Sequence, residues 1–128
     1  MWIKGSCTPH TPEIPSNCRT VILIDGDNCI SYALLGLDRM PEDVFVIAYF
    51  SQASACNRFR ASAKFKKYHI LAHYISPGNQ AVDRAIIRDA QKYEANGNLV
   101  YFISFDKGFL EYASPMIKIR HSIDDIEW

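Results

Sequence analysis

The sequence predicts an α/β domain in which helices cover both faces of a mainly parallel β-sheet. Short, almost continuously apolar runs alternate with longer amphipathic segments, and polar turn residues separate the two kinds of segment. Continuous apolar character is typical of strands buried on both faces, and alternation with helices is typical of parallel sheets. With 128 residues, 48% of them hydrophobic, the chain suits one compact domain.

Five segments have the character of buried strands. They are short and rich in β-branched or aromatic residues, a composition that favours the packed environment of a sheet. The predicted strands span residues 21–24, 44–50, 68–75, 99–105 and 116–119. The last segment is the weakest of the five, and we expect it at an edge of the sheet.

Helices are predicted between these strands, at residues 28–37, 52–67, 79–95 and 107–113. The pattern is clearest in the segment 79–95, where apolar residues recur at the spacing of one helical face. These residues are Val82, Ile86, Ala90 and Tyr93. Asn79 is expected to cap the start of this helix, and Gly97 to end it in a left-handed turn.

The two ends of the chain differ in composition. Residues 1–19 contain three prolines among serine, threonine and asparagine, which predicts an extended, flexible arm. Residues 20–128 are expected to form the single folded domain.

Charge and cysteine usage exclude several classes of protein. Fourteen basic and fourteen acidic residues give a formal net charge of zero, so no global field attracts nucleic acid or a membrane. The chain has no apolar run of the length that spans a bilayer, and we expect no membrane partner. The four cysteines have no C-x-x-C spacing, which favours reduced thiols in a cytoplasmic protein.

Acidic residues follow the predicted strands. Asp25 and Asp27 follow the first strand, Asp106 follows the fourth, and Asp83 lies in the first turns of the helix after the third. In parallel sheets the ligand site forms outside the carboxyl ends of the strands. We therefore expect Asp25, Asp83 and Asp106 to meet there, although 58 and 23 residues separate them along the chain.

Clustered carboxylates repel one another unless a cation lies between them. Mg²⁺ and Mn²⁺ prefer carboxylate oxygens, and they can activate a water for attack on a phosphodiester. We expect Asp25, Asp83 and Asp106 to be catalytic and to bind the metal ion, with Asp27 as a further ligand.

Two neutral residues are expected to assist these acids. Asn28 would hold a metal-bound water or a phosphate oxygen, and Ser104 would support the backbone around Asp106. Ordinary structural roles compete with each assignment, because aspartates also stabilise turns and helix N-termini. The presence of several acids at one edge favours the metal site.

A basic segment follows the second strand. Five cations lie between residues 58 and 67, at Arg58, Arg60, Lys64, Lys66 and Lys67. Three of them, Arg60, Lys64 and Lys67, fall on one face of the predicted helix. We expect Arg58, Arg60, Lys64 and Lys67 to bind the phosphate backbone of a single-stranded nucleic acid. The alternative is an ordinary solvated helix surface.

Three segments resemble the motifs of NYN domains, which belong to the PIN-like nuclease superfamily. They are LIDGDN (23–28), NQAVDRAIIRDA (79–90) and VYFISFDKGF (100–109). The resemblance covers about residues 20–119. It implies a three-layer PIN-like fold with a five-stranded sheet in the order 3-2-1-4-5, and a metal-dependent endonuclease that acts most often on RNA.

The resemblance also implies roles for particular residues. It assigns the metal ion to the same three acids, with Asn28 as an auxiliary ligand. Asp89 matches a later acid of the helical motif, but six residues turn it about 240° away from Asp83, so we rank it as peripheral. Gly108 departs from the pattern, because the family has a further aspartate there, and Asp27 is a candidate substitute for it.

The leading interpretation is a Mg²⁺- or Mn²⁺-dependent endoribonuclease. Its partners would be RNA and a protein such as an antitoxin or a processing factor, or a second copy of the chain. Gly108 leaves open a nuclease-inactive relative that binds RNA or protein. A third alternative is a haloacid dehalogenase-type phosphatase, in which Asp25 would be the nucleophile and Asp27 the acid, but a later acid pair is missing.

Overall fold

The computed structural model describes residues 3–6, 11–27, 30–62, 68, 70–76, 81–104 and 117–128. Its centre is a six-stranded sheet in the order β1-β4-β3-β2-β5-β6, in which every pair of neighbours is parallel. The strands are β1 (Ile3–Ser6), β2 (Thr20–Asp25), β3 (Val44–Phe50), β4 (Ile70–Tyr74), β5 (Leu99–Ile103) and β6 (Lys118–Arg120). The five strands from β2 to β6 have the predicted order, with the third predicted strand next to the second and the first in the middle.

Strand β1 was not predicted. It pairs with β4 from Ile3 opposite Ile70 to Ser6 opposite His73, and so adds an edge strand to the sheet. Its sequence, IKGS, has no continuous apolar run. An edge strand is stabilised mainly by backbone hydrogen bonds to its neighbour. Because these bonds do not require particular side chains, the sequence of such a strand is hard to recognise.

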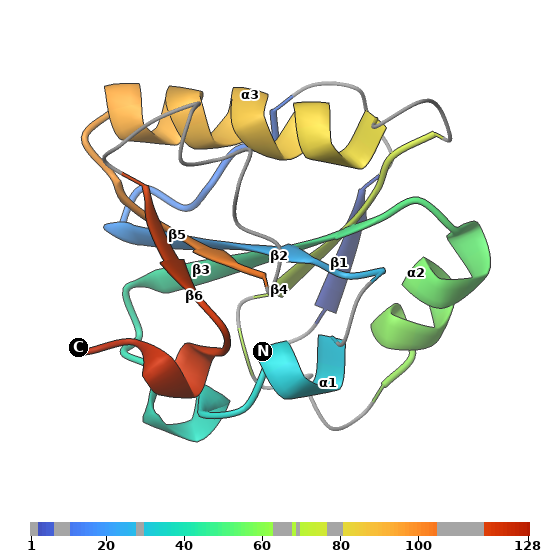
Figure 1. Cartoon of the computed structure of the whole chain (residues 1–128), viewed down its shortest axis with the longest axis horizontal. Helices are drawn as coiled ribbons and strands as arrows, with labels where there is room; N and C mark the ends of the chain where they lie inside the picture. Colours follow the sequence, from blue (N-terminus) through green and yellow to red (C-terminus); the bar gives the residue numbers. More distant parts are fainter. Residues whose placement is uncertain are drawn as a thin grey trace.

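Helices lie on both sides of the sheet, so the domain has three layers (Figure 1). Helix α3 (Ala81–Ala95) covers one face, and α1 (Ile30–Ala33) and α2 (Ala53–Arg60) lie on the other. Two short 3₁₀ turns, η1 (Leu37–Arg39) and η3 (Ile123–Asp125), pack together on the side of α1.

The two faces of the sheet form two hydrophobic cores. On β2, Val21 and Leu23 pack into the core beneath α3, whereas Ile22 and Ile24 pack into the core shared with α1 and α2. All four side chains are fully buried. Each such burial stabilises the fold by about 1.5–3 kcal/mol, which explains why residues 21–24 are all apolar.

Two predicted helices are shorter in the structure. The segment 28–37 is helical only from Ile30 to Ala33, and a turn over residues 34–36 follows. The φ of Gly36 is left-handed at 94°, and a Cβ there would meet the Asp124 backbone at 2.7 Å. The segment 52–67 ends as a helix at Arg60. Basic side chains favour a helix C-terminus, whereas like charges three or four residues apart disfavour its continuation. The prediction of a helix over residues 52–67 is wrong at residues 61 and 62, which are not helical, and residues 63–67 lie outside the described residues.

Helix α3 agrees with its prediction more closely. Its predicted apolar face is buried against the sheet, and the left-handed stop occurs at Gly97, with φ of 87°. Asn79 and the predicted helix at 107–113 lie outside the described residues.

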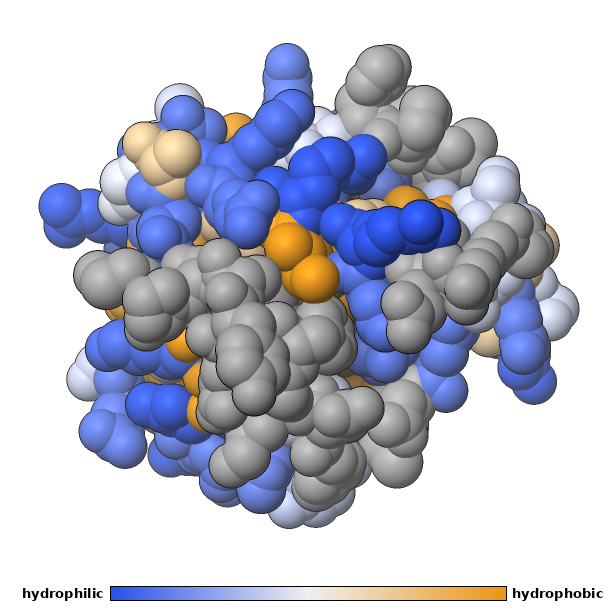
Figure 2. All heavy atoms as spheres, turned by 45° about the horizontal axis from the view of Figure 1, so that its top comes forward, coloured by the Kyte–Doolittle hydropathy of each residue, from blue (hydrophilic) through white to orange (hydrophobic). Residues whose placement is uncertain are grey.

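The surface seen in Figure 2 is mainly hydrophilic where its residues are described, with small apolar areas between polar side chains. In the part of the chain that the structure describes, no helix combines the length and apolar character needed to cross a bilayer.

Candidate functional site at the carboxyl edge of the sheet

Strands β2 and β3 end side by side, and a backbone hydrogen bond connects their ends. Asp25 lies opposite Tyr49, and the Gly26 N–H donates a hydrogen bond of 2.7 Å to the Tyr49 carbonyl oxygen. A Cβ atom at Gly26 would lie 2.7 Å from that oxygen and 2.8 Å from the Phe50 ring. Glycine is thus required for the close approach that fixes the position of Asp25.

Asp25 is half-buried at this strand end, and its Oδ1 accepts a hydrogen bond of 3.2 Å from the Asp27 N–H. Burial raises the pKa of Asp25, and the charges of Asp27 and Asp83 raise it further, while the Asp27 N–H lowers it. Asp83 lies in the first turn of α3. In Figure 1, α3 begins on the side towards which β2 points.

Asp27 makes a structural link between the two strand ends. Its Oδ1 and Oδ2 accept hydrogen bonds from the Ser51 N–H at 3.1 and 3.0 Å, and Oδ2 also accepts one from the Ser51 hydroxyl at 2.6 Å. The predicted metal ligand is thus already held by a partner that sequence reasoning missed. Ser51 directly follows a buried strand, which is the same signal that singled out Asp25.

The remaining predicted residues are only partly described. Ser104 is half-buried just after β5, where its N–H donates a hydrogen bond of 3.0 Å to the Arg120 carbonyl oxygen. Asn28, Asp106, Lys64 and Lys67 lie outside the described residues, as does Gly108. Among the residues described, no group of three or more histidine, cysteine, aspartate or glutamate side chains is arranged to hold a metal ion.

The acids that are described nevertheless suit a hard cation. Asp25 and Asp83 supply carboxylate oxygens from two separate elements, and their mutual repulsion is the kind that a cation relieves. Mg²⁺ is commonly held by one or two carboxylates together with waters and substrate phosphate. The donor set therefore fits Mg²⁺ or Mn²⁺ without a complete protein cage.

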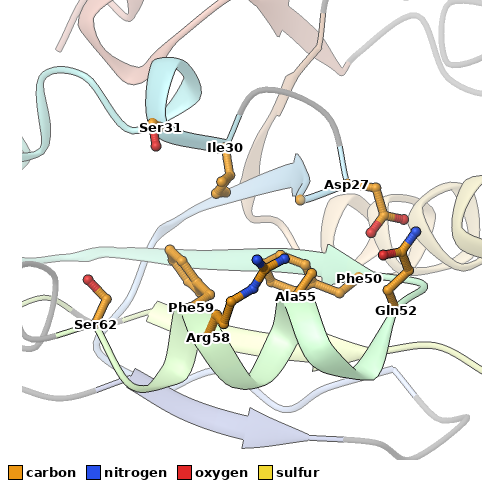
Figure 3. Close-up of a pocket in the computed structure, with 10 residues that line it drawn as sticks. Asp27, Ile30, Ser31, Phe50, Gln52, Ala55, Arg58, Phe59 and Ser62 are labelled. Atoms are coloured by element: carbon orange, nitrogen blue, oxygen red, sulfur yellow. The ribbon is translucent and has the colours of Figure 1, made fainter.

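Beside these acids, between α1 and α2, lies a cavity of about 530 Å³ (Figure 3). Apolar side chains from three elements line its inner part, namely Ile30, Phe50, Ala55 and Phe59. Polar residues also line it, namely Asp27, Ser31, Gln52, Arg58 and Ser62. Arg58 is exposed, and Arg60, on the same helix, is exposed outside this lining.

A buried polar cluster lies on the opposite face, under α3. Asp89 is completely buried, and its carboxylate accepts hydrogen bonds from the Tyr49 hydroxyl at 2.7 Å and from Arg88 Nε at 2.9 Å. His73 is also completely buried, with its ring edge-on to Tyr49 at 5.5 Å between centroids. Asp89 occurs three residues after Ile86 on the apolar face of α3, a position that indicates burial, although the sequence did not reveal its partner.

In comparisons with known proteins, no family model, no curated protein and no solved structure matches this chain. Its function has to be inferred from the residues and their geometry.

Proposed function

We propose that this protein is a Mg²⁺- or Mn²⁺-dependent endoribonuclease that hydrolyses phosphodiester bonds in single-stranded RNA. The observation that carries the proposal is the placement of two acids: Asp25 ends β2, and Asp83 lies in the first turn of α3, which begins on the side towards which β2 points (Figure 1). The two acids are 58 residues apart in the sequence, and the charge of Asp83 contributes to raising the pKa of Asp25. Asp106 is proposed as the third acid on sequence grounds.

The chemistry divides between the cation and the chain. A bound divalent cation would supply an activated water and charge neutralisation at the scissile phosphate. Asp25 and Asp83 would hold that cation, and the Asp27–Ser51 link would keep the end of β2 in place. Arg58 and Arg60 are exposed on α2, from which they can bind RNA phosphates.

The position of Asp27 disfavours the phosphatase alternative. A proton-donating acid must direct a protonated oxygen at the leaving group. Both carboxylate oxygens of Asp27 instead accept hydrogen bonds from Ser51. Asp27 is thus used as a hydrogen-bond acceptor that connects two strands.

The proposal is tested by incubating end-labelled single-stranded RNA with Mn²⁺ and the parent protein, Asp25→Asn or Asp83→Asn. We expect each substitution to lower the cleavage rate by at least about 100-fold, since each removes a charged ligand. Glu42→Gln is a matched control, because Glu42 is exposed and precedes β3 at the opposite edge of the sheet.

The outcomes separate the alternatives. Cleavage that survives both aspartate substitutions would show that the activity does not belong to this site. RNA binding without cleavage by the parent would favour a nuclease-inactive, RNA-binding module. Circular dichroism of each variant checks that the fold is retained.

A further inference from the structure

We propose that the cavity between α1 and α2 binds one unpaired nucleotide of the RNA strand and sets the nucleotide preference at the cleavage site. The inference rests on the proposed function, because it takes RNA as the ligand. The volume of the cavity, about 530 Å³, lies in the usual range for small-molecule sites.

The inner part of the cavity is apolar. Phe59 and Phe50 lie 5.5 Å apart between ring centroids at an angle of 41°, and both are buried in the core. They support the bottom of the cavity, while its accessible apolar surface comes mainly from Ile30 and Ala55. Ile30 and Ala55 are half-buried beside them and leave apolar surface facing the cavity (Figure 3). Unpaired bases bind to apolar and aromatic surfaces of this kind with little dependence on sequence.

The polar residues of the lining can form the hydrogen bonds and the ion pair that an apolar surface cannot form. The amide of Gln52 both donates and accepts hydrogen bonds, as the Watson–Crick edge of a base does. Arg58 carries a positive charge and lies over the same side of α2, where it can pair with a phosphate (Figure 3). An amide, a cation and an apolar floor together match a nucleotide better than a purely apolar ligand.

The cavity adjoins the end of β2, although Asp25 itself does not line it. Gly26 and Asp27 line it, and they directly follow Asp25 along the chain. An RNA strand whose base occupies the cavity therefore places an adjoining phosphodiester near Asp25. Occupancy of the cavity would then select which bond is cleaved.

The test measures binding without catalysis. The four 5′-mononucleotides and the corresponding nucleosides are titrated into the protein in EDTA, with ¹⁵N-labelled amides observed by NMR. We expect the signals of Gln52, Ala55 and Phe59 to shift, with one base binding more tightly than the others. Nucleotides should bind about tenfold more tightly than nucleosides, because Arg58 adds a charge-assisted contact.

Two matched pairs of variants locate the site. Ala55→Leu fills the cavity and should weaken nucleotide binding at least tenfold, whereas Ser54→Leu places the same side chain on an exposed position outside it. Arg58→Ala should remove the advantage of nucleotides over nucleosides. Lys92→Ala, which removes an exposed charge from the last turn of α3, should leave it unchanged.

Failure of this inference is distinguishable from failure of the nuclease proposal. If RNA is cleaved but no mononucleotide shifts the cavity signals, or if Ala55→Leu leaves binding unchanged, the inference is overturned while the nuclease proposal stands. If mononucleotides bind as expected but Mn²⁺ supports no cleavage, the binding site stands and the nuclease proposal fails.

Discussion

Asp25 is a residue whose proposed role opposes stability. Its raised pKa means that the ionised carboxylate is less favourable in the folded protein than in the unfolded chain. The resulting loss of folding stability is absent below the pKa that Asp25 has in the unfolded chain, and it is complete above the pKa that Asp25 has in the folded protein. The metal-free protein should therefore regain this stability as the pH falls through the folded pKa of Asp25.

Asp25→Asn should consequently stabilise the metal-free protein at pH 7 while it abolishes cleavage. We expect a gain of about 0.5–1 kcal/mol, because Asp25 is only half-buried and water screens its charge. Urea unfolding in EDTA measures the gain, with Glu42→Gln as the control. Lower stability of Asp25→Asn than of the parent would contradict this account of Asp25.

His73 predicts a second pH effect at the residue scale. It is fully buried, and neither ring nitrogen has a hydrogen-bond partner among the residues that the structure describes. Burial lowers the pKa of His73, the charge of Asp89 opposes this shift, and that of Arg88 adds to it. The unfolded chain thus binds a proton more readily than the folded protein does, so stability should fall as the pH drops below about 6.5, the ordinary histidine value.

His73→Phe tests this explanation. Phenylalanine preserves an aromatic ring beside Tyr49 but has no buried nitrogen, and it should stabilise the protein by about 1–3 kcal/mol at pH 6. The difference between variant and parent should shrink as the pH rises from 5 to 8, as followed by urea unfolding. A constant difference over this range would exclude titration of His73 as the cause.

At the scale of elements, the sequence predicted the strands and the helix whose own residues become buried. Strands β2 and β3 and helix α3 carry long apolar patterns, because each packs against neighbours on at least one full face. Strand β1 depends on β4 for its pairing, and the turn at Gly36 depends on the close approach of Asp124. Contacts between distant segments of this kind leave no local pattern to read.

The contact between β3 and α3 gives a prediction at this scale. The Tyr49 hydroxyl donates a 2.7 Å hydrogen bond to the buried Asp89 carboxylate, joining the sheet to the helix that carries Asp83. Tyr49→Phe should cost about 1.5–3 kcal/mol, the range for hydrogen bonds to charged groups. Urea unfolding of Tyr49→Phe, Asp89→Asn and the double variant measures the coupling, and additive effects would show that the two groups stabilise the fold independently.

At the scale of the whole molecule, parallel topology explains why part of the candidate site was predictable. Carboxyl ends of parallel strands share one edge, so the sequence alone indicated that Asp25 and Asp83 lie there. The hydrogen bonds between Asp27 and Ser51 could not be predicted, because they depend on the strand register in which Asp25 lies opposite Tyr49. The cavity required three elements to be packed together, and nothing in the spacing of Gln52 and Phe59 reveals it.

The zero net charge of the molecule makes RNA binding depend on a local patch. For single strands, the logarithm of the binding constant falls with the logarithm of salt concentration by about 0.7 for each phosphate neutralised. Arg58→Ala and Arg60→Ala should each reduce this slope by about 0.7, and the double variant by about 1.4. Fluorescence anisotropy of labelled RNA in EDTA measures the slopes, with Lys92→Ala as a charge-matched control at the far end of α3. Equal slopes in the parent and all four variants would place the RNA away from α2, because a protein without net charge has no long-range field to mask the loss of a local contact.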